Sequence, residues 1–345
     1  MQFVDIDGIK SKPKCIKTGV PQGSILGPLL FIIYMNDINK ATDKFEALLY
    51  ADDTSLSSIL KTVWKKDAHD TSININKELM LIHDWLLANK LSLNISKTKF
   101  MIFRYPQKPP KSLPNLDIHI DGHKLEKVSN FDFLGLTINE TLSWKHHIEK
   151  ICTKISKVIG IMSRCKRYLQ SSVMHKIYNS LILSRINYGI TCWGFDTKRI
   201  YKLQKKALRV ICKTKYNAHT DPLFLKLNTL KAKDIFQNQC LRFFYHFEKG
   251  NSPVYFHNIV ERNISGHSHN TRQINIFQST NAHRISSEKT LRHVLPKILI
   301  AIPDNVINSV YTHSLQSVKH KFKSFKLNSY QKECTIRNCY VCKKK

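Results

Sequence analysis

Two adjacent acidic residues, Asp52 and Asp53, interrupt two short apolar runs within residues 48–56. Apolar flanks around a tight polar centre predict a β-hairpin whose turn carries both carboxylates. Because like charges repel each other, such a pair needs either a cation beside it or screening by water. The sequence therefore leaves two interpretations open: a site for a hard divalent metal such as Mg²⁺, or a solvated Asp-Asp turn.

A second stretch whose residues could bind a ligand lies upstream of the acidic pair. Residues 19–28 read GVPQGSILGP, a loop that is punctuated by three glycines and two prolines. Residues 29–37 read LLFIIYMND, and the apolar segment in this region is long enough for a buried helix. A glycine-containing loop before a helix lets a ligand approach the backbone and meet the unsatisfied N–H groups of the first turn.

Four stretches of the chain together resemble the reverse transcriptases of non-LTR (LINE-type, jockey-like) retrotransposons. The loop with its helix and the YADD sequence at 50–53 resemble that family's motifs B and C. Residues 85–98, which contain WLLANKLSLN and then KT, resemble motif D, and FDFLG at 131–135 resembles the primer-grip motif E. Four motifs in family order make the resemblance specific, whereas any one alone would be weak. A group II intron maturase-like protein also shares YADD, but FLGL at 133–136 is more similar to the LINE-type sequences.

The resemblance covers roughly residues 1–215 and implies an α+β fold. Residues 1–140 would form a partial right-hand polymerase palm, an antiparallel sheet with packed helices. Residues 141–220 would form a mainly helical thumb-like region, and residues 221–345 a C-terminal helical and loop region with a basic, cysteine-containing tail. We expect the fingers and motif A, which carries the first metal-binding aspartate, to be missing from these 345 residues, because Asp5 and Asp7 are too close to the loop to be that residue.

The resemblance also implies an activity, that of an RNA-directed DNA polymerase, which is a nucleotidyltransferase. Its partners would be an RNA template, a DNA primer and deoxynucleoside triphosphates, and its cofactor would be Mg²⁺ or Mn²⁺. Asp52 would bind the metals, with Asp53 as a supporting acid. The other implied roles are nucleotide or template contact by Gln22, Gly23, Ser24, Tyr50 and Ala51, assistance to the departing pyrophosphate by Lys97, and a primer grip at Phe133, Leu134 and Gly135.

Two of these assignments have competitors, and the activity itself has one. Lys99 is a rival to Lys97, and core packing is an alternative role for Phe133 and Leu134. Two metals carry a charge of +4, so two aspartates without motif A would neutralise and position them poorly. We therefore expect little or no polymerase activity from the 345 residues alone, and the alternative function is a non-catalytic, nucleic-acid-binding remnant of such an element.

The composition points to the same kind of partner. Lys and Arg number 55 and Asp and Glu 25, a net charge of +30 that favours a polyanion such as nucleic acid over a small metabolite. A generally basic, solvated surface is the alternative. Nine cysteines, an odd number, favour a reducing intracellular compartment, and the family implies nucleus and cytoplasm. No signal peptide is recognisable, and the longest apolar run, 27–35, is too short to cross a membrane.

Hydrophobic periodicity predicts the elements that would hold these residues in place. Amphipathic helices are expected over 61–89, from 144 onward, and over 173–190, 200–212 and 230–249, with shorter helices within 290–326 that include a start at Pro303-Asp304. Asp-Gly pairs at 7–8 and 121–122 predict hairpins, and strands are expected at 91–94, 100–103 and 133–138, the last closing the palm sheet. Residues 264–284 are expected to form a loop. Cys334, Cys339 and Cys342 would need a fourth ligand, such as His313 or His320, to bind zinc.

Overall fold

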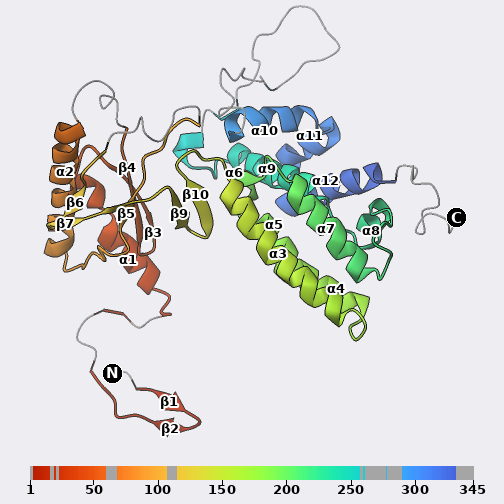
Figure 1. Ribbon diagram of the computed structural model, residues 1–345, viewed down its shortest axis with the longest axis horizontal. Helices are drawn as coiled ribbons and strands as arrows, with labels where there is room; N and C mark the ends of the chain where they lie inside the picture. Colours follow the sequence, from red (N-terminus) through yellow and green to blue (C-terminus); the bar gives the residue numbers. More distant parts are fainter. Residues whose placement is uncertain are drawn as a thin grey trace, which may run out of the picture. The chain divides into compact units, whose positions relative to one another are not determined.

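The computed structural model describes residues 3–15, 19–20, 23–59, 68–106, 115–256, 259–260, 277 and 290–331. The chain divides into two compact units, residues 1–129 (unit 1) and residues 130–345 (unit 2) (Figure 1). This division precedes the boundary at residue 140 that we expected from the sequence.

Unit 1 combines two α-helices with short paired strands (Figure 1). Hairpins form at both Asp-Gly pairs, as predicted. The elements are β1 (Asp5–Ile6) paired with β2 (Ile9–Lys10), α1 (Gly27–Met35), the short helix η1 (Ile38–Lys40), β3 (Glu46–Tyr50) paired with β4 (Asp53–Ser57), α2 (Ala68–Ala88), β5 (Lys99–Phe100) paired in parallel with β8 (Glu126–Lys127), and β6 (His119–Ile120) paired with β7 (His123–Lys124).

The helix α2 organises the interior of unit 1. Its apolar positions recur at three- and four-residue spacing, so they lie on one face. Leu79 from that face packs with Leu116 and Ile118, and Ile82 packs with Met35 and Ile38, so α2 supplies a residue to each of the two small cores. The prediction of an amphipathic helix is thus confirmed from Ala68 onward, and residues 60–67 lie outside the described part.

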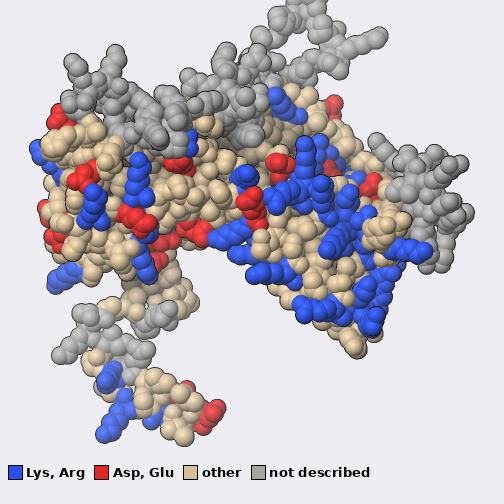
Figure 2. All heavy atoms as spheres, in the orientation of Figure 1, with Lys and Arg blue, Asp and Glu red and all other residues tan. Residues whose placement is uncertain are grey.

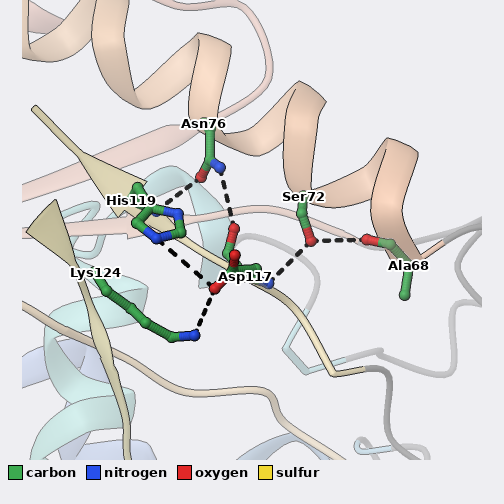
Figure 3. Close-up of polar contacts among 6 residues, drawn as sticks. All are labelled: Ala68, Ser72, Asn76, Asp117, His119 and Lys124. Atoms are coloured by element: carbon green, nitrogen blue, oxygen red, sulfur yellow. Dashed lines mark hydrogen bonds and ion pairs between the residues drawn. The ribbon is translucent and has the colours of Figure 1, made fainter. Parts of the chain in front are cut away.

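Polar side chains of α2 also hold the segment that leads into β6 (Figure 3). Ser72 Oγ accepts a hydrogen bond of 3.0 Å from the Asp117 N–H. Asn76 donates from Nδ2 to the Asp117 carbonyl at 3.0 Å and accepts from the His119 N–H at 2.9 Å. Lys124 Nζ lies 2.6 Å from the Asp117 carboxylate, and this hydrogen bond holds the pKa of Asp117 below its usual value. The backbone groups at this sheet edge therefore form hydrogen bonds with side chains of α2.

Two predictions for unit 1 are wrong. The helix α1 forms as expected but is not buried, because Leu29, Ile32 and Ile33 are each more than half exposed and Met35 is its only buried residue. A helix that is apolar on all sides can pack only one of its faces against so small a unit. Residues 91–94 form no strand, and the strand expected at 100–103 is reduced to β5.

Among its described residues, unit 2 is mainly helical and has one hairpin, β9 (Asn130–Phe133) with β10 (Leu136–Asn139). The prediction of one strand over 133–138 that closes a palm sheet is wrong, because Leu134 and Gly135 turn the chain and β10 pairs only with β9 in the described residues. The helices are α3 (Lys145–Cys165), α4 (Ser171–Tyr178) with its π-helical continuation η3 (Asn179–Leu183) and α5 (Ser184–Asn187), α6 (Ile190–Trp193), α7 (Lys198–Ile211), α8 (Asp221–Lys226), α9 (Ala232–Glu248), the short η4 (Val254–Phe256), α10 (Leu291–Ile300), α11 (Asp304–Thr312) and α12 (Leu315–Ser329).

One large core joins the helices of unit 2. The face of α3 that the sequence pattern predicted is buried at all of its apolar positions. Of the α9 residues expected to point inward, Phe236, Cys240 and Phe244 are buried, whereas Phe243 and Phe247 are only partly buried against the core. The expected helix over 173–190 ends at Asn187, because Tyr188 is extended and Gly189 has a left-handed φ of +58° before α6 begins. Pro303 precedes α11 as its N-cap, as predicted. The buried positions of α3 are Ile148, Ile151, Ile155, Val158, Ile159 and Met162.

The expected loop at 264–284, apart from Phe277, and the three cysteines of the tail lie outside the described residues. No described helix combines the length and the apolar character that crossing a bilayer requires.

Candidate functional site

The acidic pair lies at the tip of the β3–β4 hairpin in unit 1. Tyr50 pairs with Asp53, which leaves Ala51 and Asp52 as a two-residue turn. The predicted hairpin is confirmed, but Asp53 is the first residue of β4 and not a turn residue. Ala51 has a φ of +51°, a left-handed conformation that costs an L-residue about 1–2 kcal/mol. Strain of this kind concentrates at functional sites, and both carboxylates of this tip are exposed to solvent.

The donor set of this tip suits a hard cation. Mg²⁺ is commonly held by one or two carboxylates and completes its shell with water and substrate phosphates. Asp52 and Asp53 are both exposed and form no ion pair within the described residues. In the same part of the chain, no three His, Cys, Asp or Glu side chains lie together as a ready-made metal cluster. The two aspartates therefore fit one side of a divalent metal site that takes its other ligands from elsewhere.

The glycine loop upstream is described at residues 19–20 and from Gly23 onward, and Gln22 lies outside the described residues. Gly23 has a φ of +86°, a region that glycine enters without steric cost. Ser24 Oγ accepts a hydrogen bond of 3.0 Å from the Gly27 N–H at the start of α1. Ser24 thus stabilises the helix start, and Gly23 lets the loop turn into it. Pro28, at the beginning of α1, suits a position where the N–H would have no helical partner.

The two candidate lysines of the motif D segment differ in their surroundings. Lys97 lies in an exposed turn, where its N–H donates to Asn94 Oδ1 at 3.3 Å, and its ammonium forms no ion pair within the described residues. Lys99 lies in β5, and its ammonium is paired with the Glu126 carboxylate of β8. The ammonium of Lys97 is therefore available to a ligand, whereas that of Lys99 is engaged.

The predicted primer-grip residues form the tip of the β9–β10 hairpin in unit 2. Leu134 and Gly135 have φ of +47° and +78°, the two left-handed residues that a tight type I′ turn requires. Leucine is unusual in this region, so the surroundings must hold it there. The hydroxyl of Tyr188 does so by donating to the Leu134 carbonyl. Phe133 and Leu134 are half-buried, which keeps both primer contact and packing open as roles.

The base of the same hairpin is fixed to α3. His147 is 3% exposed, lies against the rings of Trp144 and Trp193, and accepts from the Thr137 N–H at Nδ1 over 3.1 Å. Asp132 pairs with Lys150, and the Lys150 hydrogen bond is the main reason that the pKa of Asp132 is lowered. The hairpin and α3 therefore form one structure, which explains why the chain divides before Asn130.

Burial lowers the pKa of His147, and this predicts a pH-dependent stability for unit 2. The folded state favours the neutral ring, so this contribution is complete above the unfolded value of about 6.5 and declines as the pH falls below it. Protonation at Nδ1 would also break the bond to Thr137. We expect the melting temperature of the unaltered chain to fall more between pH 7 and pH 5 than that of His147→Asn. The asparagine does not titrate in this range, and its amide oxygen can still accept the hydrogen bond from the Thr137 N–H. Parallel pH profiles of the two proteins would contradict this prediction.

The charge of the chain is concentrated in unit 2. Lys and Arg number 37 against 11 Asp and Glu there, compared with 18 against 14 in unit 1. Residues 150–220 contain sixteen Lys and Arg residues and a single acidic residue, Asp196. Figure 2 shows Lys and Arg side chains gathered over the part of unit 2 where α3, α4 and α7 lie in Figure 1. A surface of this sign attracts phosphates whatever their sequence.

Two helices carry most of this basic surface. On α3, exposed lysines recur at four- and three-residue spacing opposite the buried apolar face, and α7, which packs against α3, repeats the arrangement. The "basic helix pair" hereafter means the cationic side chains on these two helices. They are Lys145, Lys150, Lys154, Lys157 and Arg164 on α3, and Lys198, Arg199, Lys202, Lys205, Lys206 and Arg209 on α7.

Comparison with known proteins identifies relatives for a large part of the chain. Residues 1–138 match the model of the reverse transcriptase (RNA-dependent DNA polymerase) family. The chain is 27% identical over 251 residues to the RNA-directed DNA polymerase from mobile element jockey of Drosophila melanogaster, an alignment that covers 68% of this chain and 26% of the relative. It is 26% identical over 232 residues to the probable RNA-directed DNA polymerase from transposon BS of the same species, covering 63% and 25%.

A third relative, the Pol polyprotein from type-1 retrotransposable element R1 2 of Nasonia vitripennis, is 24% identical over 181 residues, which cover 51% of this chain and 43% of the relative. Residues 1–138 are accordingly similar to reverse transcriptases. The relatives named above are polymerases or a Pol polyprotein of mobile elements, and the chain is 24–27% identical to them. The chain spans about a quarter of the length of the jockey polymerase.

Sequence reasoning missed the residues that hold the β9–β10 hairpin. Tyr188 is 54 positions from Leu134, and no local pattern links the two. The signal for His147 was its place next to the apolar face of α3, where a buried histidine needs a partner.

Proposed function

We propose that the chain is part of an RNA-directed DNA polymerase of a non-LTR retrotransposon. In this proposal the β3–β4 hairpin of unit 1 binds the catalytic metal, and the basic helix pair of unit 2 binds the template and primer. The observation that supports it most is the YADD sequence at an exposed, strained hairpin tip inside the segment that matches the family.

The reaction would join the 3′-oxygen of the primer to the α-phosphorus of a nucleotide and release pyrophosphate. When bound, two metals supply stabilisation of the attacking and leaving oxygens. Asp52 would hold them with support from Asp53, and Lys97 would neutralise or protonate the leaving group. Gln22, Gly23 and Ser24, together with Tyr50 and Ala51, would contact the nucleotide and template. Phe133, Leu134 and Gly135 would steady the primer end.

We further infer that the 345 residues alone synthesise little or no DNA. Two carboxylates neutralise only part of the charge of two divalent metals, and no third acidic side chain completes a cluster with them in the described residues. A primer-extension assay with purified protein, a primed RNA template and Mg²⁺ or Mn²⁺ tests this, and little or no extension is expected. Robust cDNA synthesis that is lost in Asp52→Ala would support the polymerase proposal and contradict the inferred inactivity.

The second candidate is a nucleic-acid-binding remnant that retains the basic helix pair and has no polymerase role. The concentration of positive charge in unit 2 favours it, since that charge needs no metal. Binding of a primed template in the presence of a nucleotide and Mn²⁺ distinguishes the two. A remnant should bind as well, or slightly more tightly, after Asp52→Ala removes a negative charge. A polymerase domain should lose the part of its affinity that the nucleotide adds.

A further inference from the structure

Two loops of unit 2 meet at one end of the helix bundle, where the first loop ends and the second begins. Residues 166–170 join α3 to α4, and residues 212–220 join α7 to α8. Ser171 Oγ, at the start of α4, donates to the Ile211 carbonyl at the end of α7 over 3.0 Å. This bond joins the residue that follows the first loop to the residue that precedes the second, so the two loops are neighbours.

Each loop displays one tyrosine almost completely to solvent. Tyr168 is 87% exposed and Tyr216 is 89% exposed. A single exposed aromatic residue on a surface requires no explanation. Two exposed tyrosines on neighbouring loops are informative, because both rings leave a large apolar face without packing partners.

Both loops are held by the bundle. The N–H groups of Tyr168 and Leu169 donate to the Cys165 carbonyl, and Leu169 packs against the core. Arg209 Nε donates to the Ala218 carbonyl at 2.9 Å and so closes the second loop onto α7. The tyrosines are therefore presented on ordered backbone, which limits the entropy that a ligand must overcome to stack on them.

Basic residues precede both tyrosines in the chain. Tyr168 follows Lys166 and Arg167, and Tyr216 follows Lys213 and Lys215. All four of these side chains are exposed. Figure 2 shows Lys and Arg side chains at this end of unit 2. The result is a pair of rings surrounded by positive charge, in a part of the sequence where Asp196 is the only acidic residue from 150 to 220.

We propose that these two loops form a binding site for single-stranded nucleic acid, in which Tyr168 and Tyr216 stack on unpaired bases and the flanking cations bind the phosphates. Aromatic platforms in a basic setting bind single strands because every base offers a ring face, whereas the bases of a duplex are already stacked. An acidic protein would use the cations but would gain little from two exposed rings. The site adds to the proposed function and does not depend on catalysis by Asp52 or on the hairpin in unit 1.

Equilibrium binding of fluorescein-labelled oligo(U), oligo(dT) and a blunt duplex to the full chain tests the site. Tyr168→Ala and Tyr216→Ala should each weaken binding of both single strands by about tenfold, while Tyr→Phe at either position retains most of the affinity. Affinity for the duplex should stay within about twofold. Tyr255→Ala is the matched control, because Tyr255 is also 80% exposed in unit 2 but has no Lys or Arg in residues 250–260.

Charge removal gives a second readout. Lys166→Gln with Arg167→Gln should reduce the slope of log affinity against log salt for oligo(U) by about 1.4, since each contact to a single strand contributes about 0.7. Unchanged single-strand binding in both alanine variants would overturn the proposal, as would equal losses for single strand and duplex. A loss confined to an acidic polypeptide probe would assign the loops to a protein partner instead. None of these outcomes depends on primer extension, so failure of the polymerase proposal remains distinguishable.

Discussion

Replacement of Lys154, Lys157, Lys202 and Lys206 by glutamine is expected to weaken binding of a primed RNA template at least about a hundredfold near 0.1 M salt. These lysines lie on the exposed faces of α3 and α7. Each phosphate contact on a duplex adds about 0.9 to the salt slope, which corresponds to somewhat less than a factor of ten at this salt concentration. The estimate therefore holds even if only some of the four lysines make phosphate contacts. The slope of log affinity against log salt should decrease by about two to four.

The matched control removes the same charge from unit 1. Lys12, Lys14, Lys40 and Lys77 are also exposed, and their replacement by glutamine should change the affinity by less than about threefold. Fluorescence anisotropy over a salt series measures both quantities. Equal losses in the two quadruple variants would show that total charge, and not the basic helix pair, governs binding.

Replacement of Gln204 by leucine is expected to reduce the free energy of unfolding of unit 2 by about 3 kcal/mol or more. Gln204 is fully buried and makes three hydrogen bonds. Its Nε2 donates to the Tyr178 hydroxyl and to the Leu230 carbonyl, each at 2.8 Å, and its Oε1 accepts from the Ala232 N–H at 2.9 Å. Leucine fills a similar volume but leaves these groups without partners, and each buried unsatisfied group costs about 1–3 kcal/mol.

Urea denaturation followed by circular dichroism measures this effect. Gln170→Leu is the control, because Gln170 is exposed and its side chain makes no capping bond at α4. A loss below about 1 kcal/mol for Gln204→Leu would mean that the amide does not hold α7 to α9. Since α7 carries half of the basic helix pair, the destabilised protein should also bind nucleic acid less well near its melting temperature.

The sequence was most informative where a repeating pattern reports on one face of a helix. All six apolar positions predicted for α3 are buried. One face of an amphipathic helix contacts the core and the other contacts solvent, so the residue type at each position reports which face it belongs to. The two Asp-Gly hairpins were equally predictable, since their turn residues tolerate left-handed backbone.

The sequence was least informative where packing partners decide the outcome. Apolar residues on every side of α1 indicated burial, but the pattern says nothing about whether the unit supplies enough surface to cover them. The strand expected over 133–138 is a turn at Leu134 and Gly135, because the Tyr188 hydroxyl stabilises a left-handed leucine that local preferences oppose. Gln204 likewise shows no local signal, since its partners come from two distant segments, Tyr178 on α4 and residues 230–232 at the start of α9.

In the candidate site, too, some features could be predicted from local sequence and others depended on packing partners. The acidic pair and its hairpin were evident from residue type and turn chemistry. The position of Asp53 on β4, the engagement of Lys99 with Glu126 and the capping role of Ser24 depended on neighbours that only the fold provides.

The central claim is that the Asp52–Asp53 tip binds a divalent metal together with a nucleotide. Electron paramagnetic resonance of Mn²⁺, titrated with protein in the presence of a deoxynucleoside triphosphate and a primed RNA template, measures this most directly. We predict that the full chain lowers the free Mn²⁺ signal beyond that of nucleotide and template alone, and that Asp52→Asn abolishes this effect while Asp43→Asn, an equal charge change at another exposed aspartate of unit 1, preserves it. The same Mn²⁺ binding in Asp52→Asn as in the unaltered chain would contradict the account.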